Sequence, residues 1–136
     1  MATSVHEYIR RGWKFGLVGT SGFVVNQGGL MLLVGLCGLP TWLGGIIAIE
    51  VSIIANWFVN DIWTWRDRRK DIWYIRMVKY NIVAGITAFG VNYPILILLS
   101  EVVEINYALA NIIGIAMAAT MNFLLNHHWT YKEVAD

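Results

Sequence analysis

The chain has 136 residues, of which 57% are hydrophobic and 14% are charged, and its formal net charge at pH 7 is +1. A soluble domain usually carries about 25% charged residues. The composition therefore excludes an ordinary soluble domain and predicts a single transmembrane domain over residues 1–136. We predict no nucleic-acid partner, and the single cysteine, Cys37, excludes a disulfide within the chain.

Four stretches are apolar enough and long enough to cross a bilayer, which a helix does with about 20 residues. Between Lys14 and Glu50, for example, 35 residues include no Asp, Glu, Lys, Arg or His. We predict an all-α integral membrane protein with four transmembrane helices, at roughly 15–36, 41–63, 79–100 and 105–128.

The ten Lys and Arg residues lie in the N-terminal segment, the central loop and the C-terminal tail. The loops at about 36–41 and 101–106 contain none. By the positive-inside rule, both termini and the central loop are predicted to be cytoplasmic, in a multi-pass protein of the cytoplasmic (inner) membrane. The segment before the first span, with Arg10, Arg11, Trp13 and Lys14, is predicted to anchor the chain at the membrane interface.

The first predicted helix is rich in glycine, and Gly16, Gly19 and Gly22 recur every third residue. Small residues of this kind are typical of membrane helices that pack closely against a neighbour. Near mid-span, Asn26 places an amide among apolar residues, and it is a candidate for ligand binding.

Small residues and two amides are spaced by four along the second predicted helix, and this spacing puts them on one face. They are Gly44, Ala48, Ser52, Asn56 and Asn60. One interpretation is a helix–helix contact held by amide hydrogen bonds. The other is that Asn56 and Asn60 bind a ligand, because a single amide is enough to join two helices.

Glu50 lies near the centre of the same helix, where an ionised carboxylate is costly unless it faces a cavity or a partner. Three interpretations are open: a protonated acid bonded to a neighbouring helix, a partner of Asn26 or Asn92 at similar depth, and a group that couples substrate movement to protons. An acid at this depth is functional by default, so Glu50 is a candidate site residue.

The central loop, residues 66–71, is a dense cluster of charges, and residues 72–79 mix aromatic with basic side chains. We predict that residues 72–79 lie along the membrane surface. The cluster either fixes the topology as a solvated loop or holds an anionic lipid head group.

Pro94, in the third predicted helix, has no amide hydrogen and its ring crowds the carbonyl of Gly90, so a kink is predicted there. It follows Asn92 by two residues, as Gly28 follows Asn26 in the first helix. A paired interruption in matching helices points to a transporter binding site. Proline and glycine are also frequent in ordinary membrane helices, which leaves a purely structural interpretation open.

The fourth predicted helix repeats the second at an offset of 66 residues, as Ala110, Gly114, Ala118, Asn122 and Asn126. The third likewise matches the first. We therefore predict two copies of a two-helix unit, at about 10–65 and 76–131. Because each copy crosses the membrane twice, the two copies are predicted to enter it in the same direction.

His127 and His128 follow the last amide of the fourth helix, but the only other histidine is His6, so we predict no metal site. The sequence has no phosphate-binding loop and no nucleophile triad, and Glu50 has no second acid near it. We therefore predict a protein that needs no cofactor and is not an enzyme.

The two helix endings follow one pattern, Asn-x-x-x-Asn-x-x-Trp-Thr-aromatic, at residues 56–65 and 122–131. With the glycine-rich first helix and its mid-span Asn, the chain resembles the GtrA-like family of small four-helix membrane proteins over nearly its whole length. The resemblance implies a role in cell-surface polysaccharide synthesis or glycosylation. Such a protein moves a polyprenyl-phosphate-linked monosaccharide from the cytoplasmic to the outer leaflet, where a membrane glycosyltransferase uses the sugar.

This role gives each group of polar residues a candidate function. Basic residues would gather the phosphate head at the cytoplasmic face, while amides and one acid would form a polar path and the lipid tail would stay in the membrane. The head-group candidates are Arg11, Lys14, Arg66, Arg68, Arg69 and Lys79, and the path candidates are Asn26, Glu50, Asn56, Asn60, Asn92, Asn122 and Asn126.

Two other interpretations compete with a flippase. One is a non-transporting membrane partner that anchors or organises a glycosyltransferase through the charged central loop. The other is a small proton-coupled drug exporter that uses Glu50, which the charge bias and the duplicated Asn pattern disfavour. Because four helices enclose little space, we predict a homo-oligomer or a hetero-complex.

Overall fold

The computed structural model describes residues 4–133, with the side chains of residues 107 and 108 left out. The first three and last three residues of the predicted domain lie outside the described residues. Residues 4–133 form helices joined by short turns and no β-strand, and four helices in this part are long and apolar enough to cross a membrane. The prediction of an all-α protein with four such helices is confirmed.

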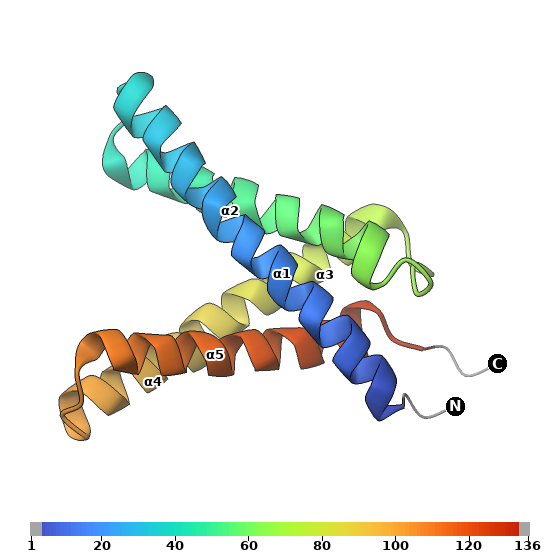
Figure 1. Cartoon of the computed structure of the whole chain (residues 1–136). Coiled ribbons are helices and arrows are strands. Elements are labelled where there is room, and N and C mark those ends of the chain that lie inside the picture. The colour runs from blue at the N-terminus through green and yellow to red at the C-terminus, as the bar shows by residue number, and fades with distance from the viewer. Residues whose placement is uncertain (1–3, 134–136) are drawn as a thin grey trace. The chain divides into compact units, whose positions relative to one another are not determined.

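The chain divides into two compact units, which we call unit 1 (Met1–Arg69) and unit 2 (Lys70–Asp136). In unit 1, helix α1 (Val5–Leu30) ends in a π-helical turn, η1 (Met31–Leu36), and α2 (Thr41–Val59) ends in a second one, η2 (Asn60–Thr64). The turn between them passes through Gly38, whose φ of 70° suits a residue without a Cβ. The two helices run side by side as a hairpin (Figure 1).

The ridge of α2, made of the residues spaced by four from Gly44 to Asn60, is the face that packs on α1. Gly44, Ala48 and Ser52 are buried, and a Cβ built on Gly29 of α1 would lie 3.4 Å from Ala48 Cβ. Farther along, Gly22 of α1 lies directly against the side-chain amide of Asn56. The ridge therefore serves the close helix contact that small residues allow in membranes.

We expect Gly22→Ala to destabilise unit 1, because the added methyl group would overlap the Asn56 amide. Overpacking of this kind costs about 1–3 kcal/mol. Gly19→Ala is the matched control, since a Cβ there meets no other atom within 4 Å. Reversible unfolding in mixed micelles, followed by circular dichroism, measures the difference. Equal stability of the two variants would mean that α1 and α2 do not pack through this contact.

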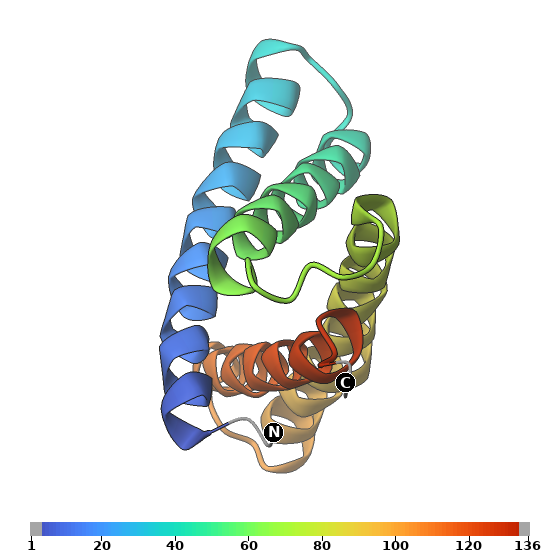
Figure 2. The ribbon, with the colours of Figure 1, turned by 90° about the vertical axis from the view of Figure 1, so that its right-hand side faces the viewer.

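Unit 2 is also a hairpin (Figure 2). Its first arm is interrupted by a π-helical turn. That arm consists of α3 (Trp73–Thr87), a π-helical turn η3 (Ala88–Asn92), the short α4 (Tyr93–Ile97) and a further π-helical turn η4 (Leu98–Val102). The second arm is α5 (Tyr107–Leu125), which ends in η5 (Asn126–Thr130). Asn92 lies against Gly114, and Asn122 Nδ2 donates a hydrogen bond to Thr87 Oγ1 at 3.1 Å.

The interruption of the third helix lies where a kink was predicted, just before Pro94. A widened turn at Ala88–Asn92 precedes the proline, which sits in the first turn of α4, the place in a helix that tolerates it. The expected match around Gly28 is absent from the described residues, because α1 continues through it to Leu30. The paired interruption was therefore predicted wrongly for the first repeat.

Two helices begin earlier than predicted. The first starts at Val5 rather than 15, with the Ser4 hydroxyl accepting a bond from the Glu7 amide as an N-cap. The third starts at Trp73 rather than 79, so residues 73–79 are its first turns and not a separate surface segment. No glycine or proline interrupts the sequence from 73 to 84, which lets one helix run on.

The faces turned away from each hairpin contact are apolar. Phe23 of α1 and its repeat counterpart Phe89 are 69% and 80% exposed. A protein in water rarely leaves so many large apolar side chains uncovered, whereas hydrocarbon solvates them well.

Candidate functional site

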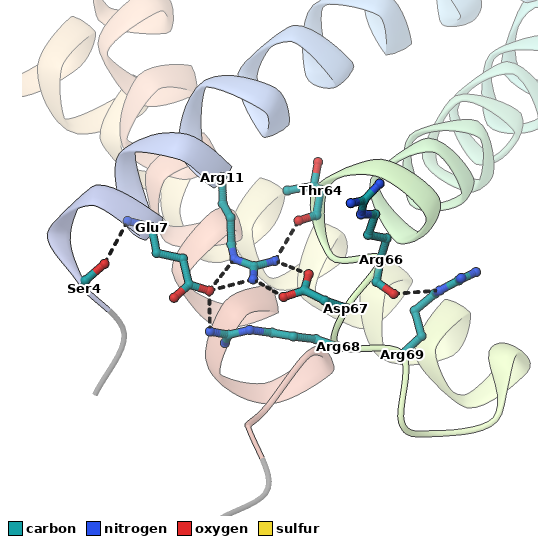
Figure 3. A network of polar contacts seen from close by, with 8 residues as sticks. All are labelled: Ser4, Glu7, Arg11, Thr64, Arg66, Asp67, Arg68 and Arg69. Carbon is teal, nitrogen blue, oxygen red and sulfur yellow. Dashed lines mark hydrogen bonds and ion pairs between the residues drawn. The ribbon is translucent and has the colours of Figure 1, made fainter. Parts of the chain in front are cut away.

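The buried guanidinium of Arg11 ties α1 to the end of α2 (Figure 3). It is 2% exposed, and its Nη1 donates to the carbonyl oxygen of Thr64 at 2.7 Å. Two carboxylates face it: Nη2 lies 2.6 Å from Glu7 Oε1 and 2.7 Å from Asp67 Oδ2. Arg68 Nη2 adds a bond of 2.8 Å to the same Glu7 oxygen. Arg11 is thus held by its own chain rather than offered to a ligand.

Asp67 keeps its negative charge in this arrangement. The hydrogen bond from Arg11 lowers the pKa of the Asp67 carboxyl, against the opposing effect of burial, and the charges of Arg11 and Arg68 lower it further. At neutral pH the carboxylate is ionised and offsets the charge of Arg11.

An open cleft of about 350 Å³ lies beside this network, and we call it the basic cleft. Arg10 and Lys14 line it together because residues four apart share a helix face. Arg66 joins them from the central loop, and its guanidinium points away from the two carboxylates (Figure 3). The full lining is Arg10, Arg11, Lys14, Trp63, Thr64, Arg66 and Asp67.

The cleft has a surplus of positive charge. Within residues 4–133, no carboxylate lies within ion-pairing distance of Arg10, Lys14 or Arg66. Lys14 Nζ lies 5.1 Å from the centre of the Trp63 ring, which is a cation–π distance. The Trp13 ring packs edge-on against the Trp63 ring, with 5.6 Å between the two ring centres. Three available cations beside tryptophans of the kind found at membrane interfaces can bind an anionic head group whose tail lies in lipid.

The two helix endings form the same small polar cluster in both repeats. Thr64 Oγ1 donates to Asn60 Oδ1 at 2.7 Å, and Thr130 Oγ1 donates to Asn126 Oδ1 at 2.8 Å. All four side chains are buried, and each pair spans a π-helical turn. The second Asn of each pattern therefore satisfies its own helix end. Through Thr64, which also accepts from Arg11, the cluster of unit 1 adjoins the basic cleft.

In unit 2, the positions that match the basic cleft of unit 1 make different contacts. Arg76, the counterpart of Arg10, is buried and donates to the Asp71 carbonyl. Tyr80 replaces Lys14 and is also buried. Lys79 pairs with the Asp71 carboxylate at 2.6 Å.

A second concave site lies wholly within unit 2, and we call it the amide groove. It is an open groove of about 230 Å³ between the interrupted arm and α5. Alanines form much of its wall, and three polar side chains line it. The lining residues are Ala84, Thr87, Ala88, Asn92, Ile115, Ala118, Ala119 and Asn122.

The structure brings together some of the predicted site residues and separates others. Arg11, Lys14 and Arg66 share the basic cleft, and Asn92 and Asn122 share the amide groove. Arg68 and Arg69 are not among the residues that line the cleft. Arg68 is buried and paired with Glu7, and Arg69 Nη1 lies 4.0 Å from Asp61 Oδ2. Lys79 belongs to the other unit.

Glu50 lies on the exposed face of α2, whereas Ala48 and Ser52 on either side are buried against α1. It is therefore off the ridge that carries Asn56 and Asn60. Asn26 of α1 is partly buried. Neither residue lines the basic cleft or the amide groove.

Arg10 is the functional candidate that the sequence analysis missed. Its four-residue spacing to Lys14 was the available signal, since it puts the pair on a different face from Glu7 and Arg11. No three His, Cys, Asp or Glu side chains between residues 4 and 133 gather as metal ligands do.

Comparison with known proteins gives two matches. The sequence model of the GtrA/DPMS transmembrane domain matches residues 14–88 and 79–136. A dolichol-phosphate mannosyltransferase of Pyrococcus furiosus is 39% identical over 120 residues, which are 87% of this chain and 33% of that protein. The chain thus spans about a third of the length of the curated relative it matches. With its four apolar helices, the chain is a multi-pass membrane protein.

Proposed function

The chain belongs to the GtrA/DPMS transmembrane-domain family, and we therefore propose that it moves a polyprenyl-phosphate-linked monosaccharide across the cytoplasmic membrane. The sugar then serves cell-surface polysaccharide synthesis or glycosylation in the outer leaflet. In this proposal the chain performs no covalent chemistry and needs no cofactor.

The observation that carries the proposal is the basic cleft. Arg10, Lys14 and Arg66 supply three cations without a carboxylate partner, while Arg11 is neutralised by Glu7 and Asp67. A sugar phosphate on a polyprenyl tail has one anionic group beside a long apolar chain. Cations attract the phosphate, and the apolar flank of α1 leaves the tail in hydrocarbon.

We further propose how the chain lies in the membrane. The positive-inside rule puts both termini and the central loop, and so the basic cleft, on the cytoplasmic side. Lipid-linked sugars made there would meet the cleft first. Asn56, Asn92 and Asn122, together with Asn26 and Glu50, then offer polar partners at greater depth, whereas Asn60 and Asn126 close their own helix ends. A homo-oligomer or a complex with a membrane glycosyltransferase would enclose more space than four helices do.

One observation favours a second candidate function, that of a non-transporting partner of a glycosyltransferase. The relative from Pyrococcus furiosus is named as a mannosyltransferase, and the stretch similar to this chain is only 33% of it. A membrane domain of this type can therefore belong to a longer protein, and this chain would then anchor or organise an enzyme.

Transbilayer movement in liposomes separates the two functions. Purified protein alone is incorporated, and the movement of polyprenyl-phosphate mannose is followed from one leaflet to the other. Movement well above that in protein-free liposomes supports the flippase. Folded protein with no such movement overturns it, and co-purification of an intact glycosyltransferase would then support the partner role.

A further inference from the structure

The amide groove of unit 2 contains a polar atom that its own chain does not satisfy. Within residues 4–133, the side-chain oxygen of Asn92 is buried and accepts no hydrogen bond. An amide oxygen removed from water without a donor costs free energy, and in a membrane no bulk water relieves it. A group that brings a donor to this oxygen is therefore favoured.

The fold holds this oxygen in place from two sides. Asn92 is the last residue of the π-helical turn η3, two residues before Pro94, and such turns are frequent at functional sites. On the other side, α5 approaches closely at Gly114, where an added Cβ would lie 2.5 Å from Asn92 Oδ1. The absence of a side chain at 114 lets the amide lie against α5.

The two repeats also differ beside the first Asn of each helix ending. In unit 1, Gly22 leaves space that the amide of Asn56 fills. The counterpart of Gly22 in unit 2 is Ala88, which lines the amide groove with Asn122 and carries a methyl group that Gly22 lacks. Asn122, the counterpart of Asn56, has internal partners instead. Its Nδ2 donates to Thr87 Oγ1 at 3.1 Å, and its Oδ1 accepts from Asn126 Nδ2 at 2.7 Å.

Asn92 Oδ1 is thus a buried side-chain acceptor beside the groove with no donor from residues 4–133, and the ligand that would satisfy it is a hydrogen-bond donor. The groove of about 230 Å³ has room for several hydroxyl-sized groups, since a water molecule occupies about 30 Å³. Its alanine walls suit the apolar face of a ring, and it lacks the basic side chains that a phosphate needs. A sugar ring has both features, because its hydroxyl groups are neutral hydrogen-bond donors and one face of the ring is apolar.

We propose that the amide groove binds the monosaccharide of the lipid-linked substrate, with a ring hydroxyl donating to Asn92 Oδ1. The inference rests on the proposed function and adds to it a sugar-binding site that lies wholly within unit 2.

Equilibrium binding of two probes to the full chain in micelles tests this assignment. One probe is a short-chain prenyl-phosphate mannose, and the other is the same prenyl phosphate without the sugar. We expect Asn92→Leu to weaken binding of the mannose probe about three- to tenfold, the value of one neutral hydrogen bond, and to leave the sugar-free probe unchanged. Asn111→Leu, at an exposed position of α5, is the matched control and changes neither.

A second variant covers the case in which Asn92→Leu fails to fold. Gly114→Ala keeps the amide but displaces it, and should lower affinity for the mannose probe alone. Its control is Gly85→Ala, where a Cβ meets no other atom within 4 Å. If Asn92→Leu and Gly114→Ala weaken both probes equally, or neither, the inference is overturned while the proposed function stands. If neither probe binds the unaltered protein, both the proposed function and this inference are overturned.

Discussion

Replacing Arg10 and Lys14 together by glutamine lowers the rate of lipid-linked sugar movement at least about tenfold, the equivalent of 1.4 kcal/mol of binding free energy. Charge-assisted hydrogen bonds to phosphate contribute about this much each, and the two residues line the basic cleft with no carboxylate within ion-pairing distance in residues 4–133. The measurement is transport of polyprenyl-phosphate mannose in liposomes at two salt concentrations. The unaltered protein should lose activity at high salt more steeply than the variant.

The control compares single charges. Lys14→Gln should slow transport, and Lys132→Gln should not, because Lys132 is exposed and lies outside the cleft. If both substitutions slow transport to the same degree, the positive charges act only by general attraction. If the double variant transports at the normal rate, the head group does not use this cleft.

Replacing Arg11 by methionine destabilises unit 1, and the loss of stability is about the same with and without substrate. Removing one partner of a buried ion pair costs about 3–5 kcal/mol, because the remaining charges lose their compensation. Here Glu7 and Asp67 are 23% and 57% exposed, so water offsets part of the loss and about 2–3 kcal/mol is expected. Reversible unfolding in mixed micelles measures it.

Arg10→Met is the matched control, since it removes the same charge from the neighbouring position. Arg10 is exposed and, within residues 4–133, has no ion pair, so its loss should change the free energy of unfolding by no more than about 0.5 kcal/mol. Arg10→Met should slow transport and leave the free energy of unfolding unchanged. Arg11→Met should instead lower the free energy of unfolding of unit 1. Equal stability of the two variants would contradict the structural role assigned to Arg11.

The pattern of apolar residues alone determined the four helices. Uncharged runs of this length have no stable alternative to a helix in hydrocarbon, where every backbone group needs an internal partner. The four-residue spacing from Gly44 to Asn60 likewise identified the face that packs on α1, because side chains four apart share one face of a helix. The Ser4-x-x-Glu7 capping pattern in the sequence could also have predicted that the first helix starts at Val5.

Only the tertiary structure decided what each polar side chain is available to do. Arg10 and Arg11 are neighbours in sequence, yet one lines a cleft and the other is buried between carboxylates, because Glu7 and Asp67 reach only one face of α1. Asn56 and Asn122 occupy the same repeat position, yet the space beside each depends on Gly22 or Ala88 across the helix contact. Spacing along a helix gives the direction of a side chain, whereas its partners come from another element and depend on the contact between the two.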